Sequence, residues 1–231
     1  MKSIKLPGYL KLLLKRIWDD SNPVSIFLYG SMSRNDFVEG SDYEIGVIYE
    51  EDKRWTRQRL RDLHSFENVK IYPFVKEELL RGEIDTPFPK LIYLHGLLHD
   101  SLILYGQKLE DIIKVTKISK DDLLEAVGFC LGRAYSAVVS SRQKDWIAVR
   151  DNFTKSSLYG FQILIFLKTG KLVFSYKEIE EKAGNLIEVE YRDLFNHVMQ
   201  VRKNDAAIET SLLYKNISFL NKSILKAIRK F

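Results

Sequence analysis

The possible folds of this chain are restricted most by two neighbouring apolar runs. The first run ends in a Gly-Ser pair, and the second opens with acidic residues. Residues 24–29, VSIFLY, are β-branched and aromatic, as buried strands are. They lead directly into Gly30-Ser31, and a second strand-like run, residues 42–49, follows the Gly40-Ser41 turn. The pattern predicts two strands with a polar site where the first ends and the second begins.

The first half of the chain alternates such strand-like runs with helical ones. Ser31 is the expected N-cap of a short helix that starts after the first strand. The other expected elements are a helix over 8–19, a solvated helix over 52–65, a strand over 69–72 that Pro73 stops, a helix after Pro89, and a strand over 101–105 that ends in Gly106.

Strand signals largely vanish after about residue 118. Ser119 and Ser175 each stand three residues before an acidic residue, which is the spacing of an N-terminal capping box. Gly170 and Gly184 stand where helix ends are expected. The apolar-periodic segments are 121–141, 145–168, 176–183, 188–202 and 205–229. We therefore predict an α+β chain, with a mixed β-sheet core flanked by helices over residues 1–110 and an all-α helical bundle domain over 111–231.

Composition narrows the class of protein. Hydrophobic residues make up 45% and charged residues 29% of the 231 residues, an ordinary globular mixture. No apolar run reaches the roughly 18 residues that span a bilayer, so no membrane partner is expected. Cys130 is the single cysteine, which excludes an internal disulfide and makes a reducing cytoplasm the expected location. The net charge of +5 permits nucleic acid as a partner without indicating it, and the oligomeric state is not readable.

The Gly30-Ser31 pair has the residue types of a phosphate site. The missing side chain of Gly30 lets a phosphate approach the backbone, and Ser31 adds a hydroxyl at the start of a helix whose free N–H groups face an anion. Arg34, one turn later, is expected either to carry positive charge toward the same point or to brace the acidic strand.

Asp42 and Glu44 are two residues apart on an expected strand, so both carboxylates project from the same face and Tyr43 from the other. Two hard oxygen ligands beside a phosphate cradle suit Mg²⁺, or Mn²⁺ in its place. Such a metal neutralises a triphosphate and activates the attacking oxygen.

In this order and register the residues resemble the nucleotidyltransferase superfamily, which has the DNA polymerase beta-like fold and includes the aminoglycoside nucleotidyltransferases. The family pattern is Gly-Ser, two residues, Arg, a loop, then Ser-Asp-x-Asp/Glu-aliphatic-x-aliphatic. It stands here as Gly30-Ser31, Arg34 and Ser41-Asp42-x-Glu44-Ile45-x-Val47. The resemblance implies a nucleotidyltransferase-type sheet core.

The resemblance also implies an activity: transfer of a nucleoside monophosphate from a nucleoside triphosphate, ATP first among them, to a hydroxyl. Asp42 and Glu44 would be catalytic and hold the metal, while Gly30, Ser31, Arg34 and Ser41 would bind the nucleotide. The acceptor stays open among a small-molecule antibiotic, a protein hydroxyl and an RNA end.

In aminoglycoside nucleotidyltransferases a lysine of the helical domain reaches over the nucleotide phosphates. Lys155 is the candidate here. The alternative is an i, i+4 ion pair between Asp151 and Lys155 on a solvated helix face.

One position departs from the family pattern. Family enzymes commonly carry a third carboxylate on the next strand, and Lys70 stands at the position that aligns with it; Glu67 would replace it only in another register. An alternative hypothesis is therefore a catalytically degenerate nucleotide-binding or regulatory protein of the same fold. Lys70 touching a phosphate directly is a further possibility.

A third hypothesis concerns the helical half. Arg192 and His197 resemble the Arg-x4-His signature of HEPN-type helical bundles, in which these side chains serve phosphodiester cleavage. This hypothesis predicts a ribonuclease, or a partner of small nucleotidyltransferases.

Overall fold

The protein was analysed as a computed structural model that describes residues 6–38, 40–51, 68–84, 86, 88–204 and 206–231. The chain divides into two compact units, Met1–Thr116 and Lys117–Phe231. Residues beyond the expected boundary at 110 belong to the first unit, because Ile112 and Ile113 are buried in its core. The expected helix over 52–65, and Glu67, lie outside the described residues.

The first unit is built on a four-stranded sheet with the order β3-β2-β1-β4. Its strands are β1 (Ser25–Tyr29), β2 (Tyr43–Tyr49), β3 (Val69–Val75) and β4 (Leu102–Gly106). β1 runs antiparallel to β2 and to β4, whereas β2 runs parallel to β3. The sheet is therefore mixed, as the sequence predicts.

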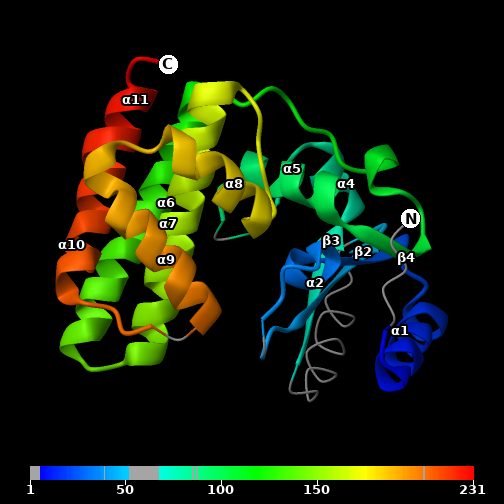
Figure 1. Ribbon diagram of the computed structural model, residues 1–231. Coiled ribbons are helices and arrows are strands. Elements are labelled where there is room, and N and C mark those ends of the chain that lie inside the picture. Colours follow the sequence, from blue (N-terminus) through cyan, green and yellow to red (C-terminus); the bar gives the residue numbers. More distant parts are fainter. Residues whose placement is uncertain (1–5, 39, 52–67, 85, 87, 205) are drawn as a thin grey trace. The chain divides into compact units, whose positions relative to one another are not determined.

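Helices cover both faces of this sheet (Figure 1). α1 (Gly8–Ser21) packs on one face, where Leu10 and Ile17 join Ile45 in one core cluster. α5 (Lys90–Asp100) packs on the other face with the 3-10 helix η2 (Leu109–Asp111), where Leu94 joins Ile48 in a second cluster. Successive side chains of β2 thus alternate between the two cores, as a pleated strand requires.

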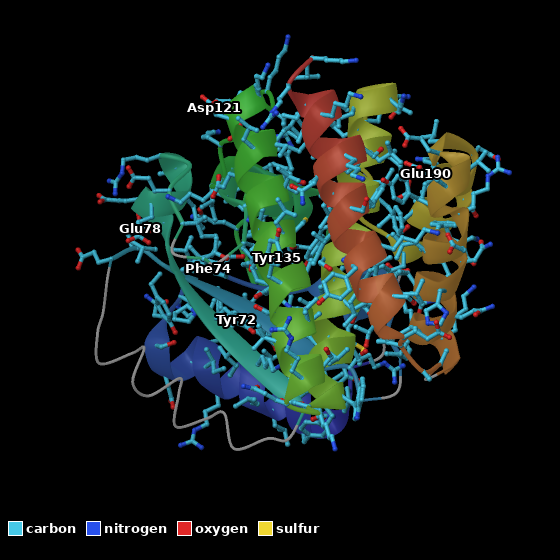
Figure 2. The ribbon with its side chains drawn as sticks, turned by 90° about the vertical axis from the view of Figure 1, so that its left-hand side faces the viewer. Tyr72, Phe74, Glu78, Asp121, Tyr135 and Glu190 are labelled. Atoms are coloured by element: carbon cyan, nitrogen blue, oxygen red, sulfur yellow. The ribbon has the colours of Figure 1, made fainter. Side chains whose placement is uncertain are left out.

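β3 does not stop at Pro73, so that expectation is wrong. The strand continues to Val75, and Pro73 pairs in register with Val47. A proline is tolerated here because β3 is an edge strand, where a missing N–H need not break a ladder on both sides. Figure 2 shows Tyr72 and Phe74 along β3 and Glu78 beyond its end, on the unanticipated helix α4 (Lys76–Leu80).

The short helix α2 (Gly30–Arg34) follows β1 directly. Its N-cap is Tyr29 and Ser31 lies inside it, so the expected cap at Ser31 is wrong. The reason is Gly30, whose φ of +75° turns the chain from strand into helix one residue before the serine.

The second unit is a bundle of helices. Its long members are α6 (Lys120–Arg142) and α7 (Trp146–Thr169), which contact each other along their lengths. The others are α8 (Tyr176–Leu186), the 3-10 helix η3 (Val189–Tyr191), α9 (Arg192–Asn204), α10 (Thr210–Ser218), the π-helix η4 (Phe219–Leu225) and α11 (Lys226–Ile228).

Local signals set several of the helix ends in this bundle. Ser119 and Asp122 form the predicted capping box, and Ser175 caps α8 through the Glu178 N–H. Gly170 ends α7 in the left-handed conformation, as predicted. Gly184 does not end α8, because it keeps a helical backbone and the helix continues to Leu186.

Aromatic side chains fill the bundle core. Phe161 is fully buried and packs against Phe195 and Phe219, with ring centroids 5.2 and 5.0 Å away. A buried ring of this size removes a large apolar area from water, so this cluster contributes strongly to the stability of the unit.

Among the described helices, α6 alone has a length and composition that would allow it to cross a membrane. Its apolar residues instead serve the bundle: Leu123, Val127 and Cys130 are buried. Burial raises the pKa of the Cys130 thiol to about 12. We therefore interpret α6 as a core helix.

Candidate active site

Glu44 lies against the turn at Gly30. The two come together because Tyr29, the last residue of β1, pairs in register with Glu44 on β2. A Cβ added to Gly30 would stand only 1.8 Å from Oε2 of Glu44. The space freed by the missing side chain, expected to admit a phosphate, therefore holds the Glu44 carboxylate in this structure.

Asp42 lies beside Lys70 of the neighbouring strand. Lys70 pairs in register with Glu44, and its Nζ lies 2.5 Å from Oδ2 of Asp42. The hydrogen bond to Asp42 raises the pKa of Lys70, and the Asp42 and Glu44 charges act in the same direction. Tyr43, between the two acidic residues, packs into the α1 core instead. Both carboxylates therefore face the same lysine from one side of β2.

Tyrosines lie near Glu44, and from the sequence we assigned them no role. Tyr29 packs edge-on against Tyr72 and Tyr93, with ring centroids 5.9 and 6.3 Å away. Burial raises the pKa of both Tyr29 and Tyr93, and the Glu44 charge raises both further. The phenols hence stay neutral beside the carboxylate. Tyr72 was foreseeable as a neighbour, because it stands two residues after Lys70 on the same strand face.

Arg34 braces the turn from behind. Its Nε donates to Asp36 at 3.1 Å and its Nη1 to Asp100 at 3.4 Å, and the side chain is only 16% exposed. Asp100 also contacts Nδ1 of His99 at 2.8 Å. These contacts tie α2 to the end of α5. The two roles expected for Arg34, charge directed at a phosphate and bracing of the acidic strand, stay predictions.

The two serines occupy different local positions. Ser31 lies in the first turn of α2, next to Gly30. Ser41 shapes the loop before β2: its Oγ accepts the Val38 N–H at 2.9 Å and its own N–H donates to the Val38 carbonyl at 3.0 Å. Ser41 thereby fixes the point at which Asp42 enters the sheet.

Lys155 belongs to the second unit and forms the expected ion pair within α7. Its Nζ lies 2.6 Å from Oδ1 of Asp151, and Nη1 of Arg133 lies 3.1 Å from Oδ2 of the same residue. Burial acts to raise the pKa of Asp151, but Lys155 and Arg133 outweigh it and lower the pKa below its ordinary value. Contact of Lys155 with a phosphate stays a prediction.

The histidine of the HEPN-like motif has a backbone contact. Nε2 of His197 lies 2.9 Å from the carbonyl of Ala207, while Arg192 is exposed at the start of α9. The ring thus fastens the middle of α9 to the segment that follows the helix. The ribonuclease hypothesis stays a prediction, and the backbone contact gives His197 an alternative, structural role.

The donor set fits one divalent cation. No group of three or more His, Cys, Asp or Glu side chains gathers within the described parts of the chain. Mg²⁺ is commonly held by one or two carboxylates together with substrate phosphates and water. Asp42 and Glu44 supply such a pair, and the third acidic position carries Lys70.

Comparisons with known proteins agree with this geometry. A family model described as a nucleotidyltransferase domain matches residues 10–97. Comparison with curated proteins found no match.

One solved structure similar to this chain is that of spectinomycin adenyltransferase AAD(9) from Enterococcus faecialis with ATP and spectinomycin. It aligns over 96% of this chain and 100% of its own, with a TM-score of 0.63 and 13% sequence identity. Identity at this level shows a common fold. Within that fold, the stretch that matches the nucleotidyltransferase domain, residues 10–97, carries the Gly-Ser turn and the acidic strand.

Proposed function

We propose that this protein is a Mg²⁺-dependent enzyme that transfers a nucleoside monophosphate from ATP to a hydroxyl acceptor and releases pyrophosphate. One observation carries the proposal. Asp42, directly before β2, contacts Lys70, whose register partner on β2 is Glu44, and the Glu44 carboxylate lies against the Gly30 turn that ends β1. This arrangement supports a site in which acidic ligands lie next to a phosphate-binding turn.

Each residue of the site has a proposed role in binding the cation or the nucleotide. Asp42 and Glu44 would hold the cation, which when bound neutralises phosphate charge and activates the attacking oxygen. The backbone at Gly30 and Ser31 would bind the phosphates, while Ser41 and Arg34 fix the loop and helix on either side. Lys155 is a proposed additional phosphate contact.

The neutral tyrosines give Glu44 a partly dehydrated setting. An ionic contact is stronger where water is excluded. Tyr29 and Tyr93 are largely buried, and their hydroxyls hydrogen-bond to each other. When nucleotide binds, Glu44 has to leave the space beside Gly30 or share it with the cation.

Calorimetry with ATP in the presence and absence of Mg²⁺ tests the proposal. The informative quantity is the ratio of the ATP affinity with Mg²⁺ to the ATP affinity without it. The ratio is needed because Asp42→Asn also removes the ion-pair partner of Lys70 and so changes the affinity for ATP without metal. We expect Mg²⁺ to strengthen binding at least about tenfold, since one charged contact is worth about 1.5–3 kcal/mol. Asp42→Asn should reduce the ratio to near one.

Lys76→Met is the matched control. Like Asp42→Asn, it breaks an ion pair between a lysine and an acidic residue. This pair lies past the opposite end of β3, where Lys76 contacts Glu50 at 3.0 Å. It should leave the ratio unchanged. Absence of ATP binding under both conditions would eliminate the proposed function.

Turnover needs an acceptor, and the similar adenyltransferase suggests the first one to try. Its structure contains spectinomycin. Pyrophosphate release should be measured with spectinomycin, with RNA and with the protein alone. Release that depends on Mg²⁺ and disappears in Asp42→Asn supports transfer.

A nucleotide-binding regulator is the second candidate. It is favoured by the contact between Lys70 and Asp42, which neutralises one of the two carboxylates. Tight ATP binding without pyrophosphate release for any acceptor class would favour this alternative over the enzyme.

A further inference from the structure

Lys70 occupies a position from which it faces both proposed metal ligands. β2 and β3 are parallel, so residues in register project from the same face of the sheet. Lys70 is the register partner of Glu44, and its Nζ lies 2.5 Å from Asp42 on the same face. The ammonium group therefore contacts one carboxylate and lies within electrostatic reach of the other.

The charge of this cluster suits one divalent cation better than two. Two-metal sites hold their ions about 3.5–4 Å apart and need anionic ligands to offset the repulsion. The described site offers two carboxylates and one ammonium, a net charge of −1, and no third acidic, His or Cys side chain gathers with them in the described ranges.

Lys70 is also able to hydrogen-bond to a bound ligand while it keeps its contact with Asp42. An ammonium has three N–H donors, and the contact with Asp42 uses one. The side chain is 52% exposed, on an edge strand. Its remaining donors are thus accessible to phosphate oxygens.

We propose that Lys70 acts as the second cation of this site: one divalent ion is held by Asp42 and Glu44, and the Lys70 ammonium binds the triphosphate where a two-metal enzyme would use another ion. This proposal rests on the proposed function. It makes Lys70 a binding residue of the site rather than a mark of lost activity.

Counting bound Mn²⁺ by electron paramagnetic resonance tests this, with the full chain and α,β-methylene-ATP. The wild-type protein should bind one Mn²⁺ per bound nucleotide. Lys70→Asp restores a carboxylate and should bind two. Lys70→Met adds no ligand and should keep one Mn²⁺, with nucleotide affinity about tenfold lower or more because a charged contact is lost.

Lys76→Met should match the wild type in both readings. Two Mn²⁺ per nucleotide in the wild-type protein would overturn the Lys70 proposal and leave the transferase proposal standing. An unchanged nucleotide affinity in Lys70→Met would also overturn the Lys70 proposal. This second test does not depend on whether Lys70→Asp folds. Absence of any bound nucleotide would remove both proposals.

Discussion

Each unit contains a lysine close to an aspartate, and the two pairs differ in what they connect. Lys70 of the first unit reaches Asp42 across two strands, at 2.5 Å. Lys155 of the second unit reaches Asp151 one turn away on the same helix, at 2.6 Å. The second pair also takes in Arg133 and fixes α6 to α7. The first lies beside Glu44, where the fold brings like charges together.

Under the proposed function, the first pair belongs to a chemical site and the second serves structure. Asp42 and Glu44 carry like charges two residues apart where β2 begins, and the one ammonium of Lys70 offsets only part of that charge. In the second unit the acidic residues with lowered pKa, such as Asp151 and Asp193, each have a basic partner on a helix. Substitutions at the Asp42–Lys70 pair should therefore affect function more than stability, and those at the Asp151–Lys155 pair the reverse.

The largest stability effect is expected in the bundle core. Phe161→Ala should lower the free energy of unfolding by about 3–5 kcal/mol, because it opens a cavity among Phe195 and Phe219. Urea unfolding followed by circular dichroism measures this. Phe231→Ala is the control, since that ring is 57% exposed and its loss should cost little. Equal losses in the two variants would contradict the proposed core.

Gly30→Ala should affect function more than stability. Its Cβ would displace the Glu44 carboxylate, and misplacing a catalytic group by about 1 Å costs roughly 100-fold in rate. The positive φ adds about 1–2 kcal/mol of backbone strain. Pyrophosphate release and thermal unfolding measure the two effects.

Gly40→Ala provides the matched control for that variant. Gly40 has a φ of +80°, but an added Cβ would meet nothing within 4 Å. It should show the same loss of stability without the loss of metal-dependent nucleotide binding. If both variants lose binding equally, the contact between Gly30 and Glu44 is not what matters.

Gly46→Ala should destabilise the sheet without removing a ligand. The new Cβ would stand 2.1 Å from the Phe27 ring, which is fully buried. Overpacking of this kind costs about 1–3 kcal/mol. Chemical unfolding of Gly46→Ala and of Gly46→Ala/Phe27→Leu tests the cause, because the smaller side chain should recover part of the loss. No recovery would place the strain elsewhere.

The smallest effect is expected from Asp151→Asn in the second unit. The pKa of Asp151 is lowered below 3.8 in the folded protein, so its carboxylate stabilises the fold above that pH and loses this effect as the pH falls through the folded value. The side chain is 47% exposed, and the gain at pH 7 should be below about 1 kcal/mol. The difference in unfolding free energy between the variant and the wild type should shrink and then disappear as the pH is lowered below 3.8. A difference that persists there would contradict the electrostatic origin.

Local signals made much of the fold predictable. The apolar run before Gly30 and the alternation around Glu44 identified β1, β2 and the face that carries both carboxylates. The capping residues Ser119 and Ser175 marked the helix starts correctly. These features depend on neighbours within a few residues, which the sequence displays directly.

Contacts between distant segments were not predictable. Pro73 stops a strand by local rules, yet β3 continues because it lies at the sheet edge. Tyr93 approaches Glu44 only because α5 covers that face of the sheet, and nothing near position 93 indicates it. Ser31 lost its expected capping role because Gly30 turns the chain one residue earlier.

The state of Cys130 has a practical consequence for the experiments above. The thiolate is the reactive form of cysteine, and this thiol is fully buried with a pKa raised to about 12. The natural chain should therefore be inert toward maleimides. Because it has no other cysteine, a single cysteine introduced on the surface of either unit would take up a spin label or fluorophore selectively. Labels placed in this way would report nucleotide binding in a protein whose native residues need no replacement.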